Sequence, residues 1–137
     1  MSSAEAQAFL SEMAGAPLFL PDLWCQLAIA DGLSGRLIGD IGVCVRSTEP
    51  CAEIGFTLAP ASQGQGLGTE AVGAALELIF ALTLVARVIA TTDARNLPSV
   101  QLLKRVGMQL QQSIQTTFRG EPCIELVFEA RNATLAA

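Results

Sequence analysis

From Cys51 to Leu58 the chain alternates between two sets of residues with the two-residue period of a β-strand. One set consists of Ala52, Ile54, Phe56 and Leu58, and the other of Cys51, Glu53, Gly55 and Thr57. Because the first set is apolar throughout, we expect it to face the core of the protein. The second set is expected on the opposite face of the strand.

The period changes to that of a helix from Gly68 to about Leu82. The apolar stripe of this helix is formed by Val72, Leu76, Ile79 and Leu82, with Glu70, Gly73 and Glu77 on the opposite side. A second helix is predicted to begin after Asn96, a favourable N-cap residue, with Pro98 in its first turn, and to end at Gly107. Between the two helices, Arg87 to Thr92 is predicted to be a strand.

The rest of the chain predicts shorter elements around this centre. We expect a helix from Ala4 to Met13 and strands at Trp24–Ala30, Leu37–Val45, Met108–Ile114 and Cys123–Glu129, with a turn at 119–122 between the last two. This order of elements is typical of an α+β fold, an α/β three-layer arrangement in which a mixed sheet is flanked by helices. A length of 137 residues without a linker or repeat predicts one domain.

Composition and charge narrow the range of partners. The chain is 51% hydrophobic and 15% charged, which favours apolar surface covered by another subunit, so a homodimer is expected. The net charge of −5 provides no basic field for a nucleic-acid backbone, and we expect no nucleic-acid partner. An acidic surface mildly favours a cationic substrate such as an amine.

Neither a metal site nor a cysteine–histidine pair is expected. The chain has four cysteines with no CxxC spacing and no histidine, so the cysteines are interpreted as reduced thiols of a cytoplasmic protein. No secretory signal is expected, because Glu5 and Glu12 interrupt the first residues. The apolar stretch 71–90 contains Glu77 and Arg87, and we interpret it as a buried helix followed by a buried strand rather than as a membrane span.

The loop from Ser62 to Thr69 carries the clearest candidate chemistry. Glycines alternate at 64, 66 and 68, and the loop opens directly into the first predicted central helix. Without Cβ atoms, several backbone N–H groups can converge on a diphosphate, and the helix dipole favours the same negative charge. A flexible glycine-rich turn without a ligand is the alternative.

A second alternative is a dinucleotide-binding turn. The segment 66–71 also satisfies G-x-G-x-x-A, and Asp93 follows at a tolerable distance. However, that turn should come directly after its strand, whereas 59–63 intervenes here, and too little chain follows Asp93 to complete a doubly wound sheet. These two features count against this reading.

Several motifs in order resemble the GNAT superfamily of acetyltransferases, specifically the branch of the Rim-type ribosomal-protein N-terminal acetyltransferases. The resemblance covers roughly 37–128. It rests on Gln63-x-x-Gly66-x-Gly68, on Ala52-Glu53-Ile54-Gly55-Phe56 before it, on Thr69-Glu70-Ala71 after it, on Asn96-Leu97-Pro98-Ser99, and on Leu103-Lys104-Arg105-Val106-Gly107-Met108. The resemblance implies a mostly antiparallel central sheet in which two parallel strands splay apart at a coenzyme site.

The same resemblance implies that acetyl-CoA is the cosubstrate and that its pantetheine arm lies in the gap between the splayed strands. The residues expected to bind it are Thr57, Leu58, Gln63, Gly64, Gln65, Gly66, Leu67, Gly68, Thr69, Asn96 and Ser99. From Leu58 back to Glu53 an extended strand covers roughly 17 Å, enough for the arm to run toward Glu53. The alternative role of Asn96 is only to cap the helix, without a contact to the coenzyme.

The resemblance further implies transfer of an acetyl group from acetyl-CoA to a primary amine, a peptide N-terminus or a small-molecule amine. A general base must then deprotonate the amine, and Glu53 matches a glutamate with this role in some members; the alternative is a solvated strand carboxylate. Many relatives use tyrosine as the acid toward the thiolate, but this chain has none, and Ser99 is the matching polar group. The opposing hypothesis is a coenzyme A-binding structural or regulatory subunit that does not catalyse.

Compared with the family, the chain is expected to be shortened at its N-terminus, lacking the first strand and helix. That loss would expose the uncharged strand Trp24–Ala30 as an edge, and exposed edges invite pairing between two copies. We therefore expect the homodimer to form there. The alternative is a monomer whose edge is covered by the N-terminal helix.

Overall fold

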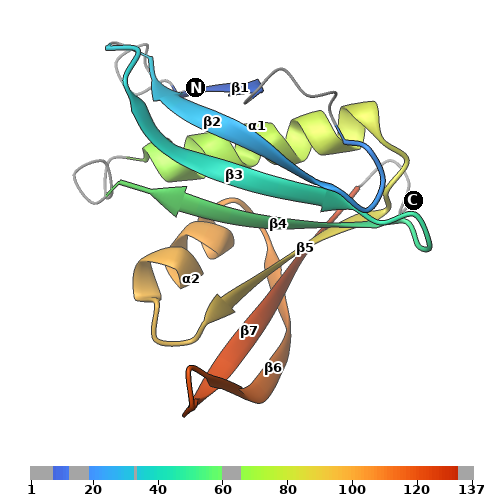
Figure 1. The fold of residues 1–137 in the computed structure, drawn as a ribbon, viewed down its shortest axis with the longest axis vertical. Helices are drawn as coiled ribbons and strands as arrows, with labels where there is room; N and C mark the ends of the chain where they lie inside the picture. Colours follow the sequence, from blue (N-terminus) through green and yellow to red (C-terminus); the bar gives the residue numbers. More distant parts are fainter. Residues whose placement is uncertain (1–7, 13–18, 33, 60–65, 133–137) are drawn as a thin grey trace.

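The computed structural model of the chain describes residues 8–12, 19–32, 34–59 and 66–132. They form one seven-stranded sheet and two helices (Figure 1). The strands are β1 Ala8–Glu12, β2 Trp24–Asp31, β3 Leu37–Val45, β4 Cys51–Leu58, β5 Arg87–Asp93, β6 Gln109–Phe118 and β7 Glu121–Arg131; the helices are α1 Leu67–Leu82 and α2 Leu97–Arg105.

The strands follow the order β1-β2-β3-β4-β5-β7-β6, and every neighbouring pair is antiparallel except β4 and β5. The parallel pair is short: it runs from Cys51↔Arg87 to Ile54↔Ala90, although both strands continue for several residues beyond. The predicted mixed, mostly antiparallel sheet with a splayed parallel pair is therefore confirmed.

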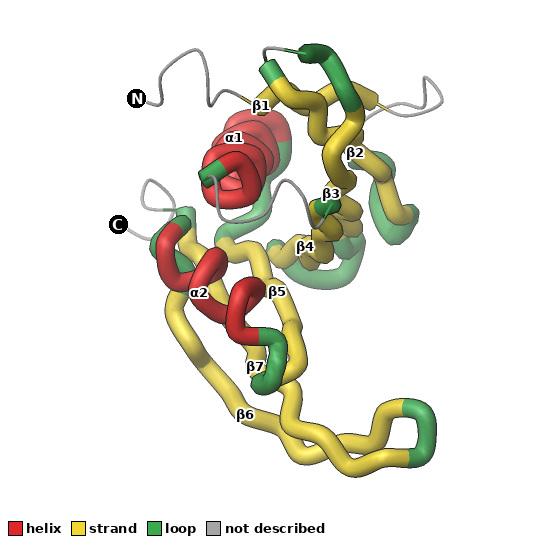
Figure 2. Tube along the Cα trace, turned by 90° about the vertical axis from the view of Figure 1, so that its left-hand side faces the viewer, coloured by secondary structure: helices red, strands yellow, loops and turns green. Residues whose placement is uncertain are grey.

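Both helices pack on the same face of the sheet, and Figure 2 shows them on one side of the strands. The core between them contains apolar side chains from β2 to β5, α1, α2 and β7, of which Ile41, Ile79, Leu103 and Phe128 are fully buried. Burying such side chains contributes roughly 1.5–3 kcal/mol each. The predicted alternation of β4 is confirmed, since Ile54 and Phe56 contribute to this core and Glu53 points to the other face.

The N-terminal helix prediction was wrong for the residues that the structure describes, because Ala8–Glu12 is strand β1. It pairs antiparallel with β2, from Ala8↔Asp31 to Glu12↔Leu27. Alanine and glutamate favour a helix locally, but pairing satisfies the backbone groups along the edge of β2, and this long-range gain outweighs a propensity of a few tenths of a kcal/mol per residue. The edge on which we based the homodimer is thus occupied by the same chain.

Two further boundaries differ from the prediction. Leu82 was placed in the apolar stripe of α1, but it lies in the last turn and is 58% exposed. The final hairpin is longer than expected, because Arg119 and Gly120 both adopt positive φ (53° and 82°) and turn the chain in two residues. Pro122, which we expected in the turn, instead lies in β7 opposite Thr117.

Candidate coenzyme site

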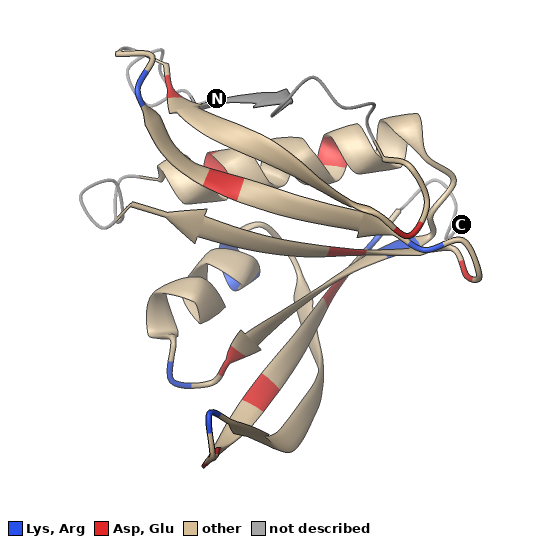
Figure 3. Cartoon of the chain, viewed as in Figure 1, with Lys and Arg blue, Asp and Glu red and all other residues tan. Residues whose placement is uncertain are grey.

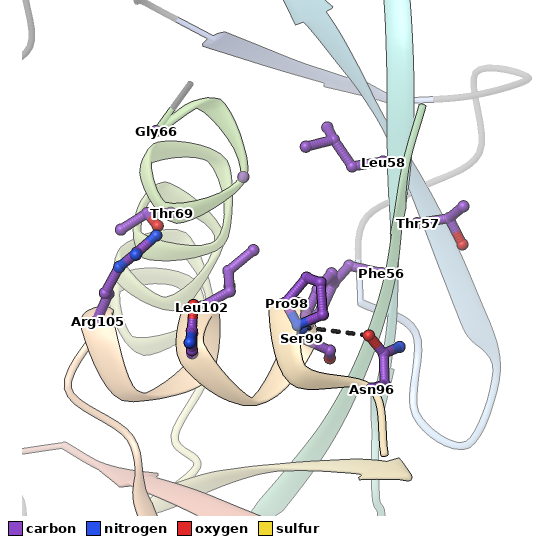
Figure 4. A pocket seen from close by; sticks show the side chains of 12 residues that line it. Phe56, Thr57, Leu58, Gly66, Thr69, Asn96, Pro98, Ser99, Leu102 and Arg105 are labelled. Atoms are coloured by element: carbon purple, nitrogen blue, oxygen red, sulfur yellow. Dashed lines mark hydrogen bonds between the residues drawn. The ribbon is translucent and has the colours of Figure 1, made fainter. Parts of the chain in front are cut away.

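A pocket of about 620 Å³ opens where β4, α1 and α2 meet (Figure 4). It lies at the end of β4 where that strand no longer pairs with β5. The lining residues are Phe56, Thr57, Leu58, Gly66, Gly68, Thr69, Asn96, Pro98, Ser99, Gln101, Leu102 and Arg105. The sequence predicted seven of them, namely Thr57, Leu58, Gly66, Gly68, Thr69, Asn96 and Ser99.

The N-terminus of α1 forms one wall of the pocket. Gly66 is its N-cap residue, with φ of 78°, and among the described residues no side chain caps this helix end. The first-turn N–H groups of a helix lack partners within the helix, so those of Leu67, Gly68 and Thr69 can donate to an anion. The Leu67 side chain itself is buried in the core and is not part of the pocket wall.

Helix α2 forms the opposite wall and begins with a local cap. The Asn96 Oδ1 atom accepts a hydrogen bond from the backbone N–H of Ser99 at 3.3 Å, as the dashed line in Figure 4 marks. The predicted capping role of Asn96 is therefore present, and it leaves the amide NH₂ group of this exposed residue outside that contact. Ser99 is half-buried beside it.

The two helices approach closely at Gly68. A Cβ atom at this position would lie 2.7 Å from the Leu102 Cδ1 atom. Glycine at 68 therefore has a packing role as well as the predicted role of leaving space for a ligand.

Four residues of α2 in the pocket were missed by the sequence reasoning. They are Pro98, Gln101, Leu102 and Arg105, which follow a spacing of three and four residues. That spacing places them on one face of a helix. They could therefore have been predicted as neighbours of Ser99 in the site. Phe56 was missed because it was assigned only to the core.

Arg105 is the one charged residue among those that line the pocket. Its side chain extends toward Thr69 in the first turn of α1 (Figure 4). It forms no salt bridge with any residue that the structure describes. An unpaired guanidinium beside a helix N-terminus gives this end of the pocket a positive potential.

The structure does not bring Glu53 into the pocket. Glu53 lies on the opposite face of β4, next to Ile54, the last residue to pair with β5. Its Oε1 atom accepts a hydrogen bond from the Arg46 Nη2 atom at 3.0 Å, and the Arg46 Nη1 atom binds Glu49 at 2.8 Å. The bonds to Glu49 and Glu53 raise the pKa of Arg46.

This ion pair belongs to a wider cluster at the start of β4 and β5. Arg87 lies 3.8 Å from Glu49 and 3.3 Å from the buried Glu129, which also binds Arg131 at 2.8 Å. Burial raises the pKa of the Cys51 thiol, which is fully buried within the cluster, while Arg87 and Arg46 act in the opposite direction. Through these ion pairs the cluster connects the turn before β4 with β5 and β7.

Asp93 ends β5 just before α2 and pairs with its neighbour Arg95. Arg95 donates to both carboxylate oxygens of Asp93, and these bonds lower the pKa of Asp93 to about 2. Asp93, the acidic residue that a dinucleotide-binding turn would need, is therefore bound to Arg95 in the same turn.

The predicted ligands Gln63, Gly64 and Gln65 lie outside the described part of the chain.

The sequence profile of the Acetyltransferase (GNAT) domain matches residues 1–109. The chain belongs to the GNAT acetyltransferase family. It is 37% identical over 73 residues to the uncharacterized N-acetyltransferase YnaD of Bacillus subtilis (strain 168), a match that covers 53% of this chain and 43% of YnaD.

The fold is also similar to solved acetyltransferase structures. RimJ of Mycobacterium smegmatis, in complex with CoA-disulfide, gives a TM-score of 0.73 at 21% identity and covers 83% of this chain and 56% of RimJ. The microcin C7 self-immunity acetyltransferase MccE, in complex with acetyl-CoA and AMP, gives a TM-score of 0.72 at 18% identity and covers 80% and 61%. The chain therefore spans less than two thirds of the length of these relatives.

Neither helix of the described residues could span a membrane.

Proposed function

We propose that this protein binds acetyl-CoA in the pocket between β4, α1 and α2 and transfers the acetyl group to a primary amine. The observation that carries the proposal is the coincidence of three features at one place: an uncapped helix N-terminus, a splayed parallel strand pair and a lone guanidinium. Membership of the GNAT acetyltransferase family supports the same reading.

The coenzyme is proposed to lie with its diphosphate against the start of α1 and its pantetheine arm beside the end of β4. Thr57 and Leu58 lie beyond Ile54, the last residue of β4 to pair with β5, and both line the pocket, so an extended arm can run beside this end of the strand. Asn96 and Ser99 face the arm from α2, and Thr69 adds a hydroxyl near the phosphates. Gln63, Gly64 and Gln65, which lie outside the described residues, remain predicted ligands.

For the acyl transfer we propose that the amine attacks the thioester carbon from the face of the sheet on which Glu53 lies. The pairing of β4 with β5 ends at Ile54, one residue beyond Glu53, so a thioester that enters the gap after this pair would meet the carboxylate. A carboxylate accepts a proton from the ammonium directly or through water, and the neutral amine then forms the new C–N bond. The C–S bond breaks, the sulfur leaves as a thiolate, and the second proton of the nitrogen passes to that thiolate or to water. Ser99 is proposed as the group nearest the leaving sulfur. A thiol pKa of about 8.5 lets the thiolate leave with little help.

Replacing Glu53 by glutamine is expected to lower kcat with a reactive amine by roughly tenfold or more, in line with the 10²–10⁴ typical of general acid–base groups. The affinity for acetyl-CoA should stay unchanged, because Glu53 lies outside the pocket. Steady-state kinetics over an amine panel and calorimetry with acetyl-CoA measure the two quantities.

Glu49→Gln is the matched control for this test, since Glu49 is bound to the same Arg46 but has no proposed role in proton transfer. If both variants lose activity equally, the ion cluster and not a base is responsible. Wild-type activity in Glu53→Gln at neutral pH would mean that the proton goes to another group or to water.

Arg105→Gln is expected to weaken acetyl-CoA binding by about tenfold, which corresponds to one charge-assisted hydrogen bond to a phosphate at a partly solvated site. Lys104→Gln is the control, because Lys104 occupies the same last turn of α2 but does not line the pocket. Repeating the titration with coenzyme that lacks the 3′-phosphate identifies the phosphate concerned: the effect of Arg105→Gln disappears if the 3′-phosphate is the partner. Equal affinities for the two variants would exclude a direct contact.

A coenzyme A-binding protein without catalysis is the second candidate, and the engagement of Glu53 by Arg46 favours it. The two candidates differ in one assay. If acetyl-CoA binds but neither hydrolysis nor transfer to any amine of the panel is detected, the binding-only function is correct.

A further inference from the structure

A row of side chains outside the coenzyme pocket lies on the face of the sheet opposite the two helices. Trp24, Cys44 and Glu53 are Cα partners across β2, β3 and β4, so their side chains share this face. Trp24 is 53% exposed, although tryptophan is highly buried on average. A bound acceptor can therefore reach an aromatic ring in the same row as the proposed base.

Two glycines leave open space between this ring and Glu53. Gly42 and Gly55 lie opposite each other on β3 and β4, two residues along each strand from the row. A Cβ atom at 42 would lie 3.3 Å from the Trp24 Cε3 atom, so the ring lies over Gly42, whereas a Cβ atom at 55 would meet nothing within 4 Å. Glycine inside a strand often marks a place where a ligand approaches closely. The surface at Gly55 is open, with Glu53 roughly 7 Å away along β4.

The ion cluster that contains Glu53 is balanced in charge. Its members are three arginines and three glutamates, Arg46, Arg87, Arg131, Glu49, Glu53 and Glu129, and Figure 3 shows blue and red segments gathered around the turn between β3 and β4. An acceptor that carries only an ammonium group would add a positive charge to this cluster. An acceptor with an ammonium and a carboxylate adds no net charge and offers a partner to both Arg46 and Glu53.

The ion pair between Arg46 and Glu53 can be exchanged for such an acceptor. The two side chains are 35% and 32% exposed, and a half-exposed pair of this kind contributes little to stability. Arg46 can keep Glu49 on its Nη1 atom and present Nε and Nη2 to a substrate carboxylate, which a guanidinium binds through two parallel N–H groups. The same exchange frees Glu53 to accept a proton from the ammonium.

We propose that the acceptor is a free α-amino acid with a large apolar side chain. Its ammonium group and carboxylate are adjacent, as Glu53 and Arg46 are, and each binds the group of opposite charge. Its side chain lies over Gly55 against the Trp24 ring. The inference rests on the proposed acyl transfer, because acetylation of the α-nitrogen by the steps given above would yield an N-acetyl amino acid and coenzyme A.

Calorimetric titration in the presence of coenzyme A, which has no acetyl group to transfer, tests recognition separately from catalysis. L-phenylalanine is expected to bind roughly tenfold or more tightly than 2-phenylethylamine, which lacks only the carboxylate. L-phenylalaninamide imitates the first residue of a peptide and should bind as weakly as the amine. Equal affinities of the three ligands, or no measurable binding of L-phenylalanine, would overturn the proposal. Tight binding of L-phenylalaninamide would overturn it in favour of a peptide N-terminus.

Turnover with acetyl-CoA and the same three ligands distinguishes this inference from the proposed function. Binding of L-phenylalanine with the expected preference but without acetylation would support the recognition and contradict the acyl-transfer function. Acetylation of all three ligands at equal kcat/KM would support acyl transfer and contradict the preference for an amino acid.

Two variants test the residues that carry the proposal. Arg46→Gln should lower the affinity for L-phenylalanine roughly tenfold or more without weakening the binding of 2-phenylethylamine, since only the first has a carboxylate. Trp24→Ala should weaken both ligands alike, because both carry the phenyl ring. Arg36→Gln is the control with the same change of charge, because Arg36 is exposed in the connection between β2 and β3, and it should alter neither affinity.

Circular dichroism reports whether each variant keeps the fold. Wild-type affinity for L-phenylalanine in folded Arg46→Gln would show that Arg46 does not bind the carboxylate, and the proposal would be wrong. Should Arg46→Gln not fold, the comparison of the three ligands on the wild type and on Trp24→Ala still decides.

Discussion

Gly39→Ala is expected to destabilise the protein more than any other single methyl group added to the sheet. A Cβ atom at 39 would lie 2.1 Å from the carbonyl oxygen of Thr57 and 3.0 Å from the Leu58 Cα atom, far inside van der Waals contact. Both are backbone atoms, which no side-chain rotation can move away. We expect a loss of at least about 2 kcal/mol in the free energy of unfolding, measured by denaturant titration.

The same substitution should also weaken acetyl-CoA binding, since Thr57 and Leu58, the residues that it displaces, line the pocket. Gly55→Ala is the matched control: it lies on the partner strand β4, and a Cβ atom there meets nothing within 4 Å. If Gly39→Ala were as stable as Gly55→Ala, the close approach of β3 to the end of β4 would be wrong.

The central strands could be predicted because burial imposes a visible period on them. The predicted bounds of β3 and β4 agree with the structure, and the core face of β4 was identified from its alternation alone. Local signals also placed α2, where Asn96 caps the first turn through the backbone N–H of Ser99. In each case the signal that permits the prediction lies within a few residues of the chain.

The predictions that failed concern segments whose structure depends on distant parts of the chain. Nothing in Ala8–Glu12 itself distinguishes a strand from a helix; the pairing with β2, some twenty residues away, decides it. β6 is exposed on both faces, so burial gives it no readable alternation, and its length is set by the hairpin with β7. The sheet edge was misplaced for the same reason: which strand ends the sheet depends on the whole topology, and β2 is covered by β1.

For the site, the sequence located the helix N-terminus and the cap of α2, but not the wall that α2 contributes. A motif contains only the residues that a family shares. Gln101 and Arg105 line the pocket because they lie on the face of α2 that turns toward it, and the motif does not specify that face. The separation of Glu53 from the pocket follows from strand geometry, because successive residues of β4 point to opposite faces.

Gly66→Val is expected to abolish acetyl-CoA binding while leaving the fold intact. Gly66 holds a φ of 78°, which a β-branched residue does not adopt, so the loop must rearrange where it enters α1. Space is not the obstacle, since a Cβ atom at 66 meets nothing within 4 Å. Losing two charge-assisted hydrogen bonds from the displaced first-turn amides, at roughly 1.5 kcal/mol or more each, would lower the affinity about a hundredfold.

Calorimetric titration of acetyl-CoA measures this loss, and thermal unfolding reports whether the fold survives. Gly73→Val is the control, because Gly73 lies within the same helix α1, its φ is not positive, and an added Cβ atom also meets nothing within 4 Å. Gly66→Asn separates two causes, since asparagine tolerates positive φ but carries a side chain. Retained binding in Gly66→Asn would assign the loss to backbone conformation, and failure of both variants would assign it to contact between the ligand and any side chain at 66. Wild-type affinity in a folded Gly66→Val protein would remove the coenzyme from this helix end, and with it the site on which the acyltransferase proposal depends.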